Sequence, residues 1–153
     1  MANLQDLAKP ALERLLQAEP DQLFAELGLR QKAIENDPTQ AGLFEPTATY
    51  DAPFAGPLDV LKEFGQGFFD RVNKDLYNLV CGDDANNANE RKKLLDAFGL
   101  GGVAFAGVLT SVLISSFGWA PAIATVVAAL VVKLFFNNAQ AAMCEVWKKH
   151  LLA

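Results

Sequence analysis

The sequence predicts an all-α protein built around an apolar helical hairpin. Residues 97–132 contain no charged side chain over 36 consecutive positions. Gly118, Trp119, Ala120 and Pro121 interrupt this stretch near its middle, and glycine and proline so close together are typical of a turn. Outside the stretch, apolar residues recur at intervals of three and four, which is the period of an amphipathic helix.

Residues 1–36 predict short acidic helices. Apolar residues of the first dozen positions share one helical face. Pro20 suits the first turn of a second helix over residues 21–27, and Gly28 is expected to end it. A third short helix is expected over residues 29–36. Residues 1–57 carry nine acids against four bases, so the front of the chain is distinctly acidic.

Residues 37–57 predict a mostly extended connector. Four of the seven prolines fall within these 21 positions, and proline favours extended and turn conformations. Phe44, Tyr50 and Phe54 are interleaved with the prolines, whereas a flexible linker is usually poor in aromatic residues. We therefore expect this segment to lie against a surface, either of the chain itself or of a protein partner.

Residues 58–93 predict an amphipathic helix followed by a polar loop. The helix is expected over residues 57–80, with Gly82 as its C-terminal cap. Gly65 and Gly67 inside it each cost about 1 kcal/mol relative to alanine, which indicates a close helical neighbour or a bend. The next helix is expected to begin near Glu90 and to run directly into the hairpin.

Residues 94–136 predict the hairpin itself, and residues 137–153 a C-terminal amphipathic helix. The first arm is expected over Ala97–Phe117 and the second over Pro121–Phe136. At 1.5 Å per residue these arms would be about 31 Å and 24 Å long, against a bilayer core of about 30 Å. The pattern therefore favours two transmembrane helices.

Small residues recur at helical spacing along both arms, which lets helix backbones approach closely in lipid. Such stripes suit packing within the hairpin and also suit a homo-oligomer. The stripe residues are Ala104, Gly107, Ser111 and Ser115 on the first arm and Ala124 and Ala128 on the second. Trp119, between Gly118 and Pro121 at the tip, suits a membrane interface.

Charged residues flank the hairpin at its open end. Arg91, Lys92 and Lys93 precede it and Lys133 follows it, while the tip carries no charge. By the positive-inside rule both termini would stay cytoplasmic at the inner membrane, and a wholly cytoplasmic location is the alternative. Asp96 and Lys133 would lie at similar depth, where they could pair or could each reach water.

The two cysteines, Cys81 and Cys144, form neither a metal-binding spacing nor a redox motif. The first 20 residues contain three acids and no apolar signal-peptide core. We therefore expect both thiols to be reduced, as is usual for a protein made in the cytosol.

Groups suited to catalysis are scarce. His150 is the only histidine, so no common catalytic triad and no histidine-based zinc site can be assembled. Neither a metal nor another cofactor is expected. The isoelectric point of about 4.8 and the lack of a basic stripe argue against nucleic acid as a partner.

These patterns favour a non-enzymatic protein whose hairpin inserts into membrane lipid, oligomerises and permeabilises the membrane. A toxin or defence-type effector restrained by its acidic N-terminal part is one concrete form. The uncharged hairpin among amphipathic helices resembles colicin-type pore-forming domains in pattern, and no residue motif extends the resemblance to a site. The alternative is a soluble helical interaction module with a buried hairpin that binds a protein partner.

Overall fold

The computed structural model describes residues 4–44, 58–82, 85–136 and 140–152. These residues are helical and include no β-strand, so the predicted all-α class is confirmed. The elements are α1 (Leu4–Leu15), α2 (Pro20–Asn36), the 3-10 helix η1 (Pro38–Gly42), α4 (Leu58–Cys81), the 3-10 helix η2 (Ala85–Asn87), α5 (Ala88–Ala97), the 3-10 helix η3 (Phe98–Leu100), α6 (Gly102–Phe117), α7 (Pro121–Phe135) and α8 (Gln140–Leu152).

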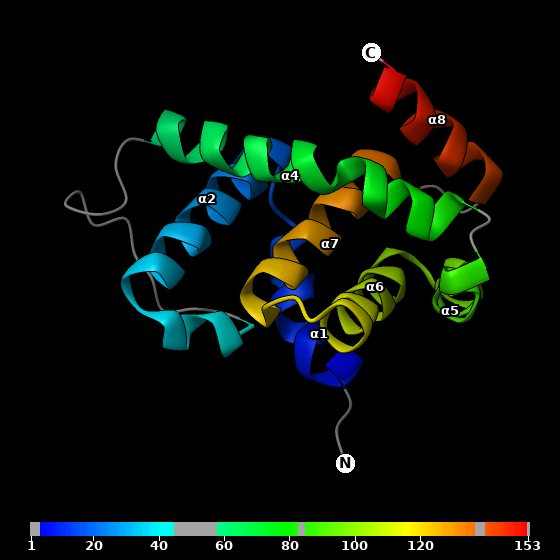
Figure 1. Cartoon of the computed structure of the whole chain (residues 1–153), viewed down its shortest axis with the longest axis horizontal. Coiled ribbons are helices and arrows are strands. Elements are labelled where there is room, and N and C mark those ends of the chain that lie inside the picture. Colours follow the sequence, from blue (N-terminus) through cyan, green and yellow to red (C-terminus); the bar gives the residue numbers. More distant parts are fainter. Residues whose placement is uncertain (1–3, 45–57, 83–84, 137–139, 153) are drawn as a thin grey trace.

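Helix α7 lies at the centre of the molecule (Figure 1). Every residue from Ala122 to Val131 is buried. Helices α1, α2 and α6 pack along α7, and α8 contacts it near its C-terminal end. A helix that is apolar on all sides needs neighbours on all sides, and these four helices supply them.

Two glycines allow α2 and α4 to cross at close range. A Cβ atom on Gly28 would overlap the carbonyl oxygen of Leu61, and one on Gly65 would overlap that of Phe24. The prediction that Gly28 ends a helix is therefore wrong: α2 continues through it to Asn36, because this glycine serves helix packing instead of a cap. The close neighbour expected at Gly65 is confirmed, whereas a Cβ atom on Gly67 would meet only the Arg71 side chain, at 3.9 Å.

The first arm of the hairpin begins later than predicted. Gly101 has φ of +100°, a backbone conformation that breaks the helix between η3 and α6. Helix α6 therefore has 16 residues and α7 has 15, which makes them about 24 Å and 22 Å long. In the described part of the chain, no helix combines the length and apolarity that a bilayer crossing requires, so the two predicted transmembrane helices lack support.

The predicted turn between the arms is present. Gly118 adopts the left-handed conformation, with φ of +71°, and its N–H donates to the carbonyl of Ile114. Pro121 occupies the first turn of α7, where its missing N–H costs no hydrogen bond. The two arms therefore pack as an antiparallel hairpin.

The predicted connector is only partly described. Residues 38–42 form η1 instead of an extended connector, because Asp37 caps this 3-10 helix by accepting a hydrogen bond from the N–H of Thr39. The expectations for Tyr50 and Phe54 lie outside the described residues.

The prediction of reduced cysteines is wrong. Cys81, the last residue of α4, forms a disulfide with Cys144 of α8, and their Cα atoms are 5.8 Å apart. The two residues are 63 positions apart in the chain, so only the packing of α8 beside the end of α4 brings them together.

Candidate functional site

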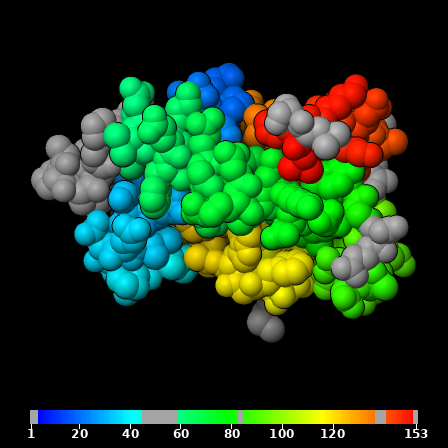
Figure 2. All heavy atoms as spheres, turned by 45° about the horizontal axis from the view of Figure 1, so that its top comes forward, coloured from blue at the N-terminus to red at the C-terminus, as the bar shows by residue number. Residues whose placement is uncertain are grey.

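The hairpin is enclosed mainly along its second arm. Residues 115–118 are exposed, whereas half of α6 and most of α7 are buried. In Figure 2 the yellow tip reaches the surface below α4, which crosses the front of the molecule in green. Val126 and Leu130, which transmembrane helices could expose to lipid, have no exposed surface and pack inside the protein.

The small residues of the α6 stripe do not all face α7. A Cβ atom on Gly107 would lie 3.8 Å from the Cβ of Gln5 in α1. Ala104 and Gly107 line a shallow groove of about 340 Å³ between α1 and α6. Ser115 is exposed and Ser111 partly so. Helix α1 therefore occupies part of the surface that was predicted for packing within the hairpin.

On α7 the predicted packing residues are fully enclosed. Ala124 and Ala128 have no exposed surface. Small side chains at these positions let neighbouring helices approach α7 closely, which fits their predicted packing role but does not by itself indicate a membrane.

The hairpin tip rests against neighbouring helices. Trp119 is partly buried, and its ring packs edge-on against Phe68 of α4 at a centroid distance of 6.0 Å. The Ser116 hydroxyl donates to the Glu90 carboxylate at 3.3 Å. Phe117 stays 44% exposed, so the tip presents an aromatic side chain to the surroundings.

The flanking charges lie at the surface. Lys92, Lys93, Asp96 and Lys133 are all exposed. The structure forms no ion pair between Asp96 and Lys133, because each of these exposed side chains extends from a different helix into solvent. Arg91 donates a hydrogen bond to the Asn78 carbonyl at 3.1 Å. The exposed His150 contacts the edge of the Phe135 ring.

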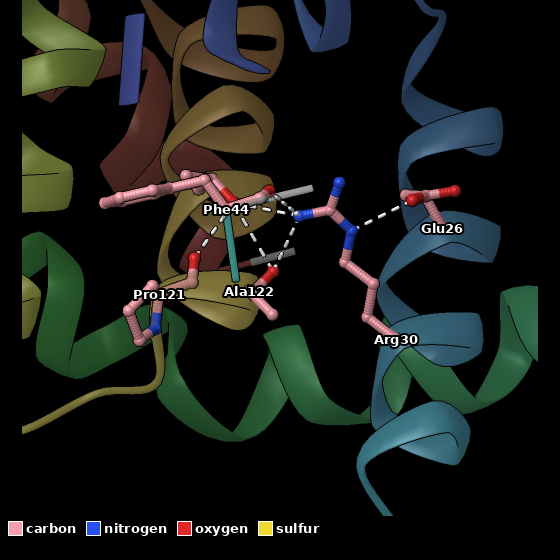
Figure 3. Close-up of polar contacts among 6 residues, drawn as sticks. Glu26, Arg30, Phe44, Pro121 and Ala122 are labelled. Atoms are coloured by element: carbon pink, nitrogen blue, oxygen red, sulfur yellow. Dashed lines mark hydrogen bonds and ion pairs between the residues drawn. The ribbon is translucent and has the colours of Figure 1, made fainter. Parts of the chain in front are cut away.

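The most unusual polar group in the enclosure is Arg30 of α2. Its residue surface is only 1% exposed. Its Nη1 donates to three oxygens: the Phe44 carbonyl at 2.8 Å, the Ala122 carbonyl at 2.9 Å and the Thr125 hydroxyl at 3.0 Å. Its Nε donates to the Glu26 carboxylate at 2.9 Å. Figure 3 shows the guanidinium reaching from α2 toward the first turn of α7.

We call Glu26, Arg30, Phe44, Ala122 and Thr125 the Arg30 cluster. A buried cation is costly unless it is paired and hydrogen-bonded, and this cluster supplies one carboxylate and three neutral oxygens. Thr125 in turn donates to the Pro121 carbonyl at 3.0 Å. The Arg30 side chain therefore joins α2 to Phe44, which follows η1, and to the start of the hairpin's second arm.

The sequence analysis did not identify Arg30 as a functional residue, because Arg30 was counted only among the four bases of an acidic segment. A usable signal was present. Leu23, Leu27, Arg30 and Ile34 follow one another at intervals of three and four, so the arginine occupies a position on an apolar helical stripe. A charge at such a position indicates a buried, partnered side chain.

Asp37 caps η1, and the pKa of its carboxyl group tests how the segment before Phe44 is folded. The hydroxyl and the N–H of Thr39 donate to its carboxylate at 2.6 Å and 3.2 Å, and these bonds hold the pKa of Asp37 below its ordinary value. Because the folded pKa is lowered, the stabilisation of η1 is present above the unfolded pKa and is lost as pH falls through the folded one. We expect a carboxyl NMR titration to place the midpoint of Asp37 below that of Asp37 in the Thr39→Ala variant. Equal midpoints would contradict the hydrogen bond from the Thr39 hydroxyl to Asp37.

A second hollow of about 670 Å³ lies between α1, α2 and α4. Asp21 and Lys62 form an ion pair across it at 3.2 Å, and both side chains reach solvent. Among the residues that the structure describes, His, Cys, Asp and Glu side chains do not gather as a metal site. This hollow offers a mixed, solvated surface without a convergent reactive group.

No family model, curated protein or solved structure matches this chain.

Proposed function

We propose that this protein is a non-enzymatic effector that stores an apolar hairpin and delivers it to a lipid bilayer, where the hairpin oligomerises and permeabilises the membrane. The observation that carries the proposal is the enclosure of α6 and α7, the core of a stretch of 36 uncharged residues, by α1, α2 and α4. A toxin or defence-type effector needs such storage, because an exposed apolar hairpin would aggregate before it reached a membrane.

The acidic N-terminal part acts as the restraint in this proposal. Helix α1 packs on α6, and α2 packs on α7. Arg30 adds a buried polar connection to the first turn of α7. The acidic N-terminal helices α1 and α2 therefore contact both arms of the hairpin.

Insertion requires the stored arms to lengthen or the bilayer to thin, because about 24 Å and 22 Å fall short of a hydrocarbon core of about 30 Å. The uncharged residues 97–101 precede α6, and straightening at Gly101 would add them to the first arm. We propose that this occurs at the inner membrane with both termini on the cytoplasmic side, as the flanking basic residues favour.

Cross-linking α1 to α6 in the full chain tests the proposal. Cysteines at positions 5 and 107 would have Cβ atoms about 3.8 Å apart, which is the usual separation in a disulfide. We expect the oxidised Gln5→Cys/Gly107→Cys protein to release dye from phosphatidylcholine–phosphatidylglycerol vesicles at least about tenfold more slowly than wild type, because its hairpin cannot leave α1 and only the competent fraction acts.

The matched control is Gln5→Ser/Gly107→Ser, which changes the same positions without a cross-link. It should release dye at the wild-type rate. Equal leakage from the cross-linked and serine proteins would show that the hairpin does not act by leaving its enclosure. Absence of leakage from every form, with no protein left in carbonate-washed membranes, would remove the membrane function altogether.

The second candidate is an interaction module whose hairpin remains a permanent core. The burial of residues 122–131 of α7 and the short arms favour it. In that case the partner surface would include residues 37–44, where Leu43 is 43% exposed. A monodisperse, detergent-free protein that never binds vesicles would favour this candidate over the first.

A further inference from the structure

The disulfide closes a loop that contains the whole hairpin. Cys81 ends α4, Cys144 lies in α8, and the 62 residues between them include α5, α6 and α7. The bond therefore joins the segment that enters the hairpin region to the segment that leaves it.

Helix α8 covers the base of α7 through one aromatic side chain. Trp147 has no exposed surface, and its ring stacks on Phe135 of α7 at a centroid distance of 4.8 Å. Its Nε1 donates to the Asn73 side chain of α4 at 2.7 Å. Tyr77 of α4 packs against the same ring edge-on. The contact between α4 and α8 thus shields the C-terminal end of α7.

We propose that the Cys81–Cys144 disulfide is a redox switch that holds α8 over the base of the hairpin, and that its reduction releases α8 and increases access of the hairpin to lipid. This inference rests on the proposed membrane function and names its regulation. The bond stays closed in oxidising surroundings and opens in a reducing compartment.

The reaction is a thiol–disulfide exchange with a dithiol reductant. A thiolate of the reductant attacks one of the two sulfurs, forms a mixed disulfide and expels the other sulfur as a thiolate. The second thiol of the reductant then displaces the remaining cysteine. The reductant is oxidised to its disulfide, and Cys81 and Cys144 each end as a thiol after taking up one proton. Both cysteines are only partly buried, so a small dithiol can reach them.

Loss of the bond weakens α8 because the helix is short. An isolated helix of 13 residues is marginal in water. The covalent bond keeps α8 beside α4 at a high effective concentration, and its removal leaves mainly the buried Met143 and Trp147 to hold the helix. We expect the released fraction of α8 to rise on the order of a hundredfold.

The full chain carrying Trp119→Phe makes Trp147 the sole tryptophan, because the sequence has only two. Phenylalanine keeps an aromatic partner for Phe68. Dithiothreitol is the reductant, and alkylation followed by mass spectrometry measures how many thiols it frees. On full reduction we expect a red shift of Trp147 emission, stronger acrylamide quenching, and dye release from phosphatidylcholine–phosphatidylglycerol vesicles on the order of tenfold faster, in line with a larger competent fraction.

The Cys81→Ser/Cys144→Ser protein is the control for the reductant itself. It should behave as the reduced form and should not respond to dithiothreitol. An unchanged Trp147 environment after full reduction would overturn the switch. So would equal leakage from oxidised and reduced protein, although the membrane function would then survive. Release of Trp147 without leakage from either form would overturn both proposals.

Discussion

Gly28→Ala is expected to destabilise the protein by about 3 kcal/mol or more, at the upper end of what overpacking usually costs. The added methyl group would overlap the Leu61 carbonyl oxygen across the crossing of α2 and α4. Because the obstacle is backbone, no side-chain rotation can relieve the overlap, and the two helices must separate. Urea unfolding followed by circular dichroism measures the loss.

Gly65→Ala should cost a similar amount, because its methyl group would overlap the Phe24 carbonyl oxygen at the same crossing. The two changes should not add fully, since the first one already forces the helices apart. A double variant that loses clearly less than the sum of the two single losses would support a shared crossing.

Gly67→Ala is the matched control on the same helix. The nearest atom to its added methyl group is the Nη1 of Arg71 at 3.9 Å, an ordinary contact. Alanine inside a helix is favoured over glycine by about 1 kcal/mol, so this variant should be slightly more stable than wild type. If all three variants were destabilised alike, the losses would have to be attributed to something other than the crossing.

These glycines also show where sequence reasoning succeeded and failed. Periodicity located α4, and the absence of charge located the hairpin and its turn at Gly118. A glycine in a sequence can mark a helix end, a close helix crossing or a break in a helix, however. Gly28 was read as a helix end, and it is a crossing point. Gly101 lay inside the predicted first arm, and its backbone conformation divides that arm into η3 and α6. Only the position of a neighbouring helix, or the backbone angle itself, distinguishes these roles.

Contacts between segments that are far apart in the chain were harder to predict from the sequence. The disulfide was missed because the sequence says nothing about how α8 packs on α4. The small residues of α6 were assigned to the hairpin's own packing because helical spacing identifies a face but not its partner, and the partner at Gly107 is α1. Arg30 could have been found, because its position on an apolar stripe was readable.

Arg30→Met is the second change with a large expected effect. Methionine has similar length and leaves the Phe44 and Ala122 carbonyls without the donor that now reaches them. Leaving a buried acceptor without its donor typically costs about 1–3 kcal/mol. We therefore expect the urea midpoint to fall sharply while the remaining α4–α8 contact stays intact, as judged by the buried environment of Trp147.

Glu26→Gln provides the matched control in the same cluster. Its amide keeps an oxygen that can accept from the Nε of Arg30, so only the negative charge beside the buried cation is lost. Because the Glu26 side chain is already 31% exposed, solvent screens part of that charge, and the loss should be smaller than that of Arg30→Met. A loss of unfolding free energy as large as that of Arg30→Met would show that the ion pair, and not the carbonyl contacts, makes the larger contribution to stability.

The Arg30 variant also links stability to the proposed restraint. If the Arg30 cluster holds the start of α7 in place, its loss should increase vesicle leakage as well as lower stability, whereas a purely structural role would lower stability alone. Gly28→Ala supplies the comparison, because it weakens the α2–α4 crossing without touching the hairpin directly. At equal residual stability, adjusted with urea, Arg30→Met should therefore leak faster than Gly28→Ala. Equal leakage at equal stability would assign the effect to general loosening of the fold and would remove Arg30 from the restraint.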